Sequence, residues 1–217
     1  MRSSSEEDYL KAIYSLSIKG DTISTNDIAR SLSMKASSVT DMLKKLADKK
    51  WVNYIKYKGV SLSKEGEMIA LLIIRKHRLW ETFLVNQLNF KWDQVHEIAE
   101  QLEHIDSIEL INRLDKHLGF PKFDPHGDPI PNEKGEIKDL RKSQPLSSLK
   151  KGDRGIIIGV IDGTPVFLRY LDNEGLNLGT EILVEDIYDF DSSYKLKIKG
   201  KNLTVSDRVS QNLLIQF

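Results

Sequence analysis

Apolar residues repeat at helical spacing over the first quarter of the chain. Tyr9, Ile13 and Leu16 share one face of a helix predicted over residues 8–18. A second short helix is expected after Ser24, and the apolar residues of a third recur at i, i+3, i+4 and i+7: Val39, Met42, Leu43 and Leu46. Two short helices at this spacing, the second of which starts with small polar residues, are typical of a helix-turn-helix.

Two short strands are predicted around Lys58 and Gly59, in the sequence WVNYIKYKGVSLSKEG. A hairpin after a helix-turn-helix is typical of the wing of a winged helix, and it completes a domain over residues 1–66. Three further helices are expected over residues 65–85, 93–105 and 106–118. A loop rich in Pro and Gly follows them, so residues 67–140 form a helical domain.

The pattern changes to period two after a linker predicted over residues 141–153. Five short strands are expected within residues 154–217, in the sequences GIIIGVI, PVFLRYL, EILVEDIY, YKLKIKG and NLLIQF. The predicted fold is mainly α with β. It combines an N-terminal winged helix-turn-helix, a helical middle domain and a C-terminal small SH3-like β-barrel.

The composition excludes several classes of site. The chain has 217 residues and no cysteine, which rules out disulfides, Cys-ligated zinc, iron–sulfur clusters and a thiol nucleophile. The longest apolar run, over residues 68–74, is too short to span a membrane, and the first residues lack the apolar core of a signal peptide. We therefore expect a cytoplasmic protein without a membrane partner, whose metal sites use His, Asp and Glu.

The net charge is zero but unevenly distributed. Residues 1–75 carry 13 Lys and Arg against 9 Asp and Glu, whereas residues 76–140 carry 8 against 13. A basic N-terminal part suits a polyanion such as DNA, and an acidic middle part suits a cation. Charge imbalances of this size also arise by chance, so the case for DNA and cation binding rests on the motifs.

Four potential metal ligands share one flank of the helix predicted after Asp93. At i, i+4, i+7 and i+8 they span an arc of roughly 100°, and they are His96, Glu100, Glu103 and His104. The preceding helix adds His77 and Glu81 at i, i+4, and Asp8 stands at the start of the first helix. Any one of these residues alone is usually solvated surface. Together they predict a divalent-metal site that suits Mn(II), Fe(II), Co(II), Ni(II) or Zn(II).

The same helix invites an alternative, a metal-dependent hydrolase that uses the His and Glu cluster. The residues from His96 to Glu100 are similar to the H-E-x-x-H helix of metalloproteases. Glu100 stands where that motif has its second His, and a hydrolase would also need an open coordination position and a base. We therefore favour a binding protein over an enzyme.

Several segments together resemble the diphtheria toxin repressor family of metal-dependent transcriptional repressors, which includes the manganese transport regulators. The resemblance covers nearly the whole chain in order and rests on the sequences EEDYLKAIY, SSVTDMLKKL, YKGVSLSKEG, RKHRLWETFL, VHEIAEQLEH and LGFPKFDPHGDPIP. It implies a homodimeric repressor of metal-uptake genes. The middle domain would bind metal and dimerise, and the C-terminal domain would be SH3-like (FeoA-like).

The resemblance also implies two metal sites in each subunit. His77, Glu81 and His96 match an ancillary site, and four residues match a site nearer the DNA-binding domain: Asp8, Glu100, Glu103 and His104. Iron-type members have Met and Cys where this chain has Asp8 and Glu100. Carboxylates at these positions move the expected cofactor from Fe(II) towards Mn(II), with other divalent transition metals binding in vitro.

Two positions depart from parts of the family. Lys11 stands where small manganese-type members have a Glu, and a cation cannot ligate, which argues against a closely spaced binuclear site. Asp124 stands where many relatives have a Cys. In streptococcal-type members the matching residues share one metal, and here they are Glu81, Asp124, His126 and Asp162. The ligating barrel positions of iron-type members fall on Gly163 and Val166, which cannot ligate. The alternative is that Asp124 and His126 only order a proline-rich turn.

DNA contacts are predicted at the start of the recognition helix and in the wing. Small residues can approach thymine methyls, hydroxyls can donate to bases or phosphates, and lysines neutralise phosphates. The candidates are Lys35, Ser37, Ser38, Thr40, Lys44, Lys56 and Lys58.

We expect a homodimer that reads a palindromic double-stranded operator, since a single winged helix binds weakly. Residues 68–74 and 107–118 are candidates for its interface. A metal ion joining Asp8 to the helix over residues 93–105 would fix the DNA-binding domain relative to the dimer core. A coupling of about 1–3 kcal/mol would give roughly 5–150-fold regulation.

Overall fold

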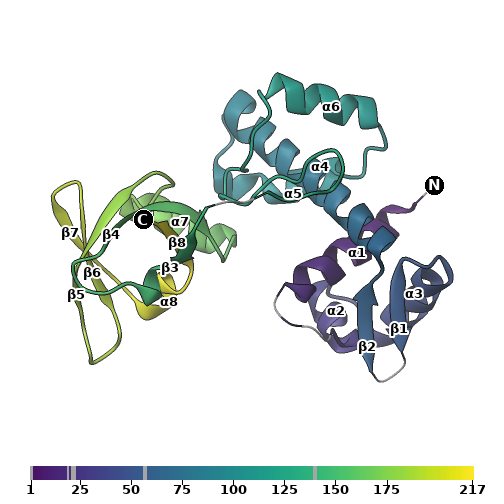
Figure 1. The fold of residues 1–217 in the computed structure, drawn as a ribbon, viewed down its shortest axis with the longest axis horizontal. Coiled ribbons are helices and arrows are strands. Elements are labelled where there is room, and N and C mark those ends of the chain that lie inside the picture. Colours follow the sequence, from purple (N-terminus) through teal and green to yellow (C-terminus); the bar gives the residue numbers. More distant parts are fainter. Residues whose placement is uncertain (1, 19, 21–22, 56–57, 139–140) are drawn as a thin grey trace. The chain divides into compact units, whose positions relative to one another are not determined.

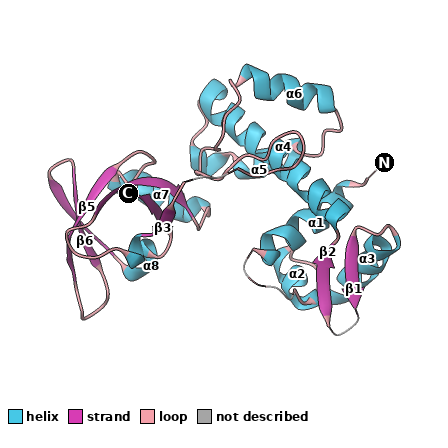
Figure 2. Cartoon of the chain, in the orientation of Figure 1, coloured by secondary structure: helices cyan, strands magenta, loops and turns pink. Residues whose placement is uncertain are grey.

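The computed structural model describes residues 2–18, 20, 23–55, 58–138 and 141–217. They fall into two compact units. The first comprises residues 1–80, 99–120 and 130–137, and the second comprises residues 81–98, 121–129 and 138–217. Figure 1 labels the helices and strands, and Figure 2 distinguishes them by colour.

Three helices and a hairpin open the first unit. Helices α1 (Ser4–Ser17), α2 (Thr25–Ser31) and α3 (Ala36–Asp48) precede the antiparallel strands β1 (Val52–Ile55) and β2 (Gly59–Leu62). This arrangement confirms the predicted winged helix-turn-helix. Helix α1 begins before its predicted start because Ser3 and Glu6 form a capping box there.

The apolar faces of these elements share one core. Its fully buried members include Tyr9, Leu10, Ile13, Ile28 and Leu43. Burial of one Leu or Ile side chain contributes about 1.5–3 kcal/mol. Because α1 and α3 supply residues to the same core, the positions of the two helices are coupled.

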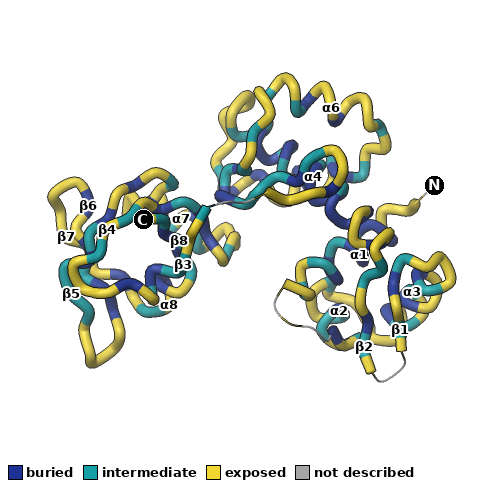
Figure 3. The backbone as a smooth tube through the Cα atoms, viewed as in Figure 1, coloured by how far each residue is buried: buried dark blue, intermediate teal, exposed yellow. Residues whose placement is uncertain are grey.

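The helical part of the chain contains α4 (Lys64–Leu88), α5 (His96–Leu102) and α6 (Ile108–His117). Buried positions recur along α4 (Figure 3). The single helix predicted over residues 93–105 is wrong at both ends. A 3-10 turn η1 (Trp92–Gln94) precedes α5, and Glu103 and His104 lie in the turn after it.

The second unit contains a six-stranded antiparallel sheet with the order β3-β8-β4-β5-β6-β7. Its strands are β3 (Ser143–Pro145), β4 (Arg154–Val160), β5 (Glu181–Ile187), β6 (Tyr194–Ile198), β7 (Lys201–Val205) and β8 (Leu213–Gln216). Helix α8 (Asp207–Ser210) precedes β8. The sheet curves around a core that includes Ile157, Val184 and Leu196 (Figure 1), as expected for a small SH3-like barrel.

The strand predicted for PVFLRYL is wrong, because these residues begin helix α7 (Pro165–Glu174). Pro165 occupies the first helical turn, where its missing N–H costs nothing, and Gly175 ends the helix with a φ of 71°. Leu168 and Leu171 are buried at helical spacing, whereas Val166 is 73% exposed. The predicted strand alternation is therefore absent, and the buried residues of this segment are three positions apart.

The segment predicted as a linker over residues 141–153 also contains regular structure. It holds β3 and a 3-10 turn η2 (Leu146–Ser148), and Leu146 and Leu149 are buried in the barrel core. The barrel therefore draws on residues before Arg154. Among the described helices, none has the length and apolar character needed to cross a bilayer.

Candidate metal centres and nucleic-acid interface

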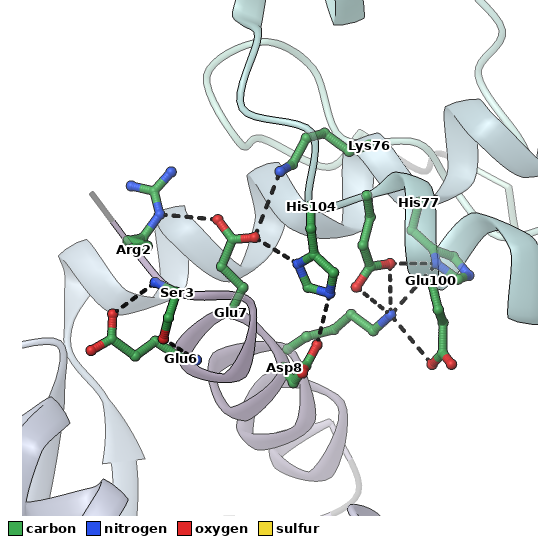
Figure 4. A network of polar contacts seen from close by, with 11 residues as sticks. Arg2, Ser3, Glu6, Glu7, Asp8, Lys76, His77, Glu100 and His104 are labelled. Atoms are coloured by element: carbon green, nitrogen blue, oxygen red, sulfur yellow. Dashed lines mark hydrogen bonds and ion pairs between the residues drawn. The ribbon is translucent and has the colours of Figure 1, made fainter.

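Three predicted ligands converge between α1 and the turn after α5. Asp8 comes from α1, Glu103 and His104 come from the turn, and their ligand atoms all lie within 4.8 Å of one another. His104 Nε2 is 3.1 Å from Asp8 Oδ1 (Figure 4). We name Asp8, Glu103 and His104 the α1–α5 cluster.

Glu103 is the buried centre of this cluster, with 0% exposure. The Lys11 ammonium donates to both Glu103 carboxylate oxygens at 2.8 Å, and His77 Nδ1 lies 2.5 Å from Oε2. Burial alone would raise the pKa of Glu103. The hydrogen bond from His77 and the charge of Lys11 outweigh it and lower that pKa, so the carboxylate stays charged.

His104 is oriented by a residue that the sequence did not indicate as functional. Its Nδ1 lies 2.8 Å from Glu7 Oε2, while Nε2 faces Asp8 (Figure 4). A carboxylate on one ring nitrogen fixes the orientation of an imidazole whose other nitrogen ligates a metal. The acidic run of Glu6, Glu7 and Asp8 was the available signal, but only the fold shows that Glu7 is buried.

The donor chemistry of the α1–α5 cluster fits a divalent cation. Burial, and to a smaller extent the nearby Glu103 carboxylate, raises the pKa of Asp8, although the His104 imidazole opposes this effect. Glu100 stands at the edge, with a side chain that is 50% exposed and an oxygen 3.7 Å from the Lys11 ammonium. Oxygen and imidazole donors without sulfur suit Mn(II) and Fe(II).

A second group of predicted ligands meets in the second unit. Glu81 lies on α4, Asp124 and His126 lie on the loop over residues 121–129, and their ligand atoms are also within 4.8 Å of one another. His126 Nδ1 is 3.5 Å from Glu81 Oε2, and its Nε2 is 2.9 Å from the Trp92 carbonyl oxygen. We name Glu81, Asp124 and His126 the loop cluster.

The charge balance of the loop cluster favours a cation. Burial would lower the pKa of His126, but the Glu81 carboxylate, Asp124 and the Trp92 carbonyl outweigh burial and raise that pKa to about 9. Asp124 also accepts hydrogen bonds from the backbone N–H groups of His126 and Asp128. Asp124 therefore orders the turn, as the alternative hypothesis expected. Its carboxylate also faces the Glu81 carboxylate and the His126 imidazole.

The backbone of the barrel holds this loop in place. Val160 of β4 donates its N–H to the His126 carbonyl at 3.1 Å. Arg141 donates to the carbonyls of Gly127 and Ile158 at 2.7 and 3.2 Å. Gly127 has a φ of 88°, and a Cβ there would lie 2.1 Å from the Ile158 carbonyl oxygen, so only glycine fits.

His77 and His96 each contact a member of one of these clusters, whereas Asp162, among the described residues, does not. His96 is exposed, and its Nδ1 is 3.5 Å from Glu81 Oε1. His77 lies one turn before Glu81 on α4 and belongs to the first unit, where it contacts Glu103. Asp162 accepts a hydrogen bond from the Thr164 N–H at 2.9 Å, and among the described residues it joins neither cluster.

Four of the predicted DNA contacts lie at the N-terminal end of α3: Lys35, Ser37, Ser38 and Thr40. Lys35 is the N-cap residue and makes no side-chain cap, so the first backbone N–H groups of α3 lack a capping side chain. Ser37, Ser38, Lys44 and Lys58 are exposed. Thr40 donates to the Ala36 carbonyl at 2.9 Å, and Lys56 lies outside the described residues. The helix dipole and the charge of Lys35 favour phosphate at this end.

Comparison with protein families matches three consecutive parts of the chain. Residues 1–60 match the N-terminal DNA-binding domain of iron-dependent repressors, and residues 63–132 match their metal-binding and dimerisation domain. Residues 144–216 match the FeoA domain.

Individual proteins show the same likeness. A solved manganese-dependent transcriptional repressor in complex with manganese is 34% identical, with a TM-score of 0.88 over 97% of this chain and 99% of that one. The diphtheria toxin repressor of Corynebacterium diphtheriae is 26% identical, over 97% of this chain and 96% of that protein. The iron-dependent repressor IdeR of Mycobacterium tuberculosis is 32% identical over 58% of this chain, and the alignment covers only 54% of IdeR.

Proposed function

Since the chain belongs to the family of iron-dependent repressors, and a solved manganese-dependent transcriptional repressor matches 97% of it, we propose that it is a metal-activated transcriptional repressor of metal-uptake genes. It would bind palindromic double-stranded operators as a homodimer in the cytoplasm. The family is one of transcriptional repressors rather than enzymes, which removes the hydrolase alternative.

The observation that carries this proposal is the α1–α5 cluster. Its ligand atoms come from the winged helix on one side and from the turn after α5 on the other, within 4.8 Å. A cation held by Asp8, Glu103 and His104 would offset the repulsion between the carboxylates and tie α1 to that turn. Helix α1 shares a core with α3, so the tie would also orient the recognition helix.

We propose Mn(II) as the first choice of activating metal and Fe(II) as the second. The donors are carboxylates and imidazole, and the chain has no cysteine to favour a softer metal. The loop cluster would hold a second ion, with Glu81, Asp124 and His126 as its ligands. Whether His77, His96, Glu100 or Asp162 adds a further ligand stays a prediction.

A homodimer would cover the apolar residues that the helical part leaves exposed. Met68 on α4 is 47% exposed, and Ile108 and Leu110 on α6 are 79% and 38% exposed. All three lie within the segment that matches the metal-binding and dimerisation domain. We therefore propose that a second copy of the chain packs on α4 and α6.

The test is metal-dependent DNA binding. An operator is selected from random duplexes in Mn(II), and its affinity is then measured by fluorescence anisotropy in Mn(II), in Fe(II) under anaerobic conditions, and with a chelator. We expect metal to tighten binding by roughly 5–150-fold. Asp8→Ala should abolish this gain, whereas Asp172→Ala, an exposed aspartate on α7, should keep it. DNA affinity that ignores metal would refute the proposal.

A further inference from the structure

We propose that Lys11 is a built-in competitor of the metal ion at the α1–α5 cluster. Its ammonium holds Glu103, and a divalent cation would gain that carboxylate only by displacing Lys11. This inference rests on the proposed function, because it specifies how the chain sets the metal concentration at which that cluster fills.

The position of Lys11 brings its ammonium into contact with the whole Glu103 carboxylate. Its Nζ is 2.8 Å from both oxygens of Glu103, so neither oxygen is left outside the contact. The same Nζ is 3.5 Å from His77 Nδ1 and 3.7 Å from Glu100 Oε1. Only 19% of the Lys11 side chain is exposed and 1% of that of Glu103, so water screens this ion pair weakly.

A metal ion and an ammonium cannot both bind Glu103 without bringing two positive charges together. In a buried place that repulsion is strong because the effective dielectric constant is low. Metal binding must therefore displace the Lys11 ammonium from Glu103. The loss of this ion pair weakens metal affinity relative to a chain without the ammonium.

The ammonium also limits how many ions the cluster can hold. Lys11 is on α1, one turn after Asp8, so its positive charge stays near Asp8 and Glu103 when a metal displaces it. A second divalent cation would be repelled by this charge as well as by the first ion. Lys11 therefore argues for one ion at this cluster, which agrees with its inability to serve as a ligand.

Lys11 has a second effect, because it is on α1 and Glu103 is in the turn after α5. The ion pair joins the same two elements that the metal would join. The Lys11–Glu103 ion pair thus connects α1 to this turn more weakly than the metal ion that would replace it. The regulatory step is then an exchange of one cation for another at Glu103, rather than the closing of an open hinge.

The experiment compares Lys11→Met with Lys45→Met, which removes one positive charge from another Lys–Glu pair of the same unit. Both are made in a His126→Ala background, so that the loop cluster does not contribute. Mn(II) affinity is measured by competition with a chelator of known affinity. Lys11→Met should bind Mn(II) at least about 10-fold more tightly than the parent, which corresponds to about 1.4 kcal/mol. Lys45→Met should bind Mn(II) with the affinity of the parent.

Thermal unfolding supplies the second readout. Without metal, Lys11→Met should melt at a lower temperature, because Glu103 loses its ammonium, and saturating Mn(II) should raise its melting temperature more than that of the parent. Lys11→Gln keeps a neutral donor near Glu103 and serves if Lys11→Met does not fold. Unchanged or weaker Mn(II) affinity in a folded Lys11 variant would overturn the inference. If the parent binds no Mn(II), the proposed function itself fails.

Discussion

Glu6 is a buried anion on which two lysines of the recognition-helix region converge. Its carboxylate is 1% exposed and lies 2.8 Å from Lys45 Nζ and 2.7 Å from Lys49 Nζ. It also accepts a hydrogen bond from the N–H of Ser3, the N-cap residue of α1. Burial alone would raise the pKa of Glu6, but the two lysines and Ser3 outweigh burial and lower it to about 2.

The variant Glu6→Gln removes the charge while keeping an acceptor for the capping box. A pKa lowered from 4.5 to about 2 corresponds to about 3 kcal/mol in favour of the charged form, at 1.36 kcal/mol per unit. Lys45 and Lys49 are 54% and 35% exposed, so solvent screening reduces the expected loss. We expect Glu6→Gln to lower the free energy of unfolding by about 2 kcal/mol.

Urea denaturation followed by circular dichroism at pH 7 measures this loss. Glu174→Gln, at an exposed glutamate of α7, is the control and should stay within about 0.5 kcal/mol of the parent. The folded-state pKa of Glu6 is depressed, so its contribution is present above about pH 4.5 and is lost as the pH falls through about 2. A difference below about 0.5 kcal/mol at pH 7, or one that grows on acidification, would refute the reasoning.

Three further outcomes are expected. Gly127→Ala should destabilise the chain by more than about 2 kcal/mol in thermal unfolding, because its Cβ would meet the Ile158 carbonyl; a wild-type melting temperature would contradict this. His126→Ala should lower the Mn(II) stoichiometry by one ion in equilibrium dialysis while Asp8→Ala in that background removes the other, and an unchanged count would exclude the loop cluster. Lys35→Ala should weaken binding to all duplexes alike and reduce the salt slope by about one, so a sequence-dependent loss would show base contact instead.

Local periodicity was sufficient for the winged helix but not for α7. In α3 the apolar residues occupy only helical positions, so one interpretation fits. In the sequence of α7, Phe167 and Leu171 are four residues apart, a spacing that fits either period, and the neighbouring segments are strands. The decisive signals were local: Pro165 at the start and Gly175 at the end. The residues at the two ends of this segment therefore indicate its structure better than the average pattern of the barrel.

The ligand types were predictable, whereas their arrangement was not. Spacing at i, i+4 placed His77 and Glu81 on one helix face, which α4 confirms. Which loop reaches which helix depends on packing between segments far apart in the sequence. The partners of Glu103 and His104, namely Lys11 and Glu7, lie over 90 residues away. No periodicity connects such residues, and only the resemblance suggested that the two segments meet.

The barrel strand β4 supports the loop cluster through its backbone, and the Arg141 side chain adds hydrogen bonds to the loop without being a ligand. Asp162 faces its own turn at Thr164, whereas the N–H of Val160 binds the His126 carbonyl and the Ile158 carbonyl faces Gly127. Backbone contacts of this kind tolerate many side-chain changes in β4 but depend on the path of the strand. A metal site can therefore require the barrel even when no barrel side chain ligates the ion. Loss of the barrel would release the loop that carries Asp124 and His126, while Glu81 stayed on its helix.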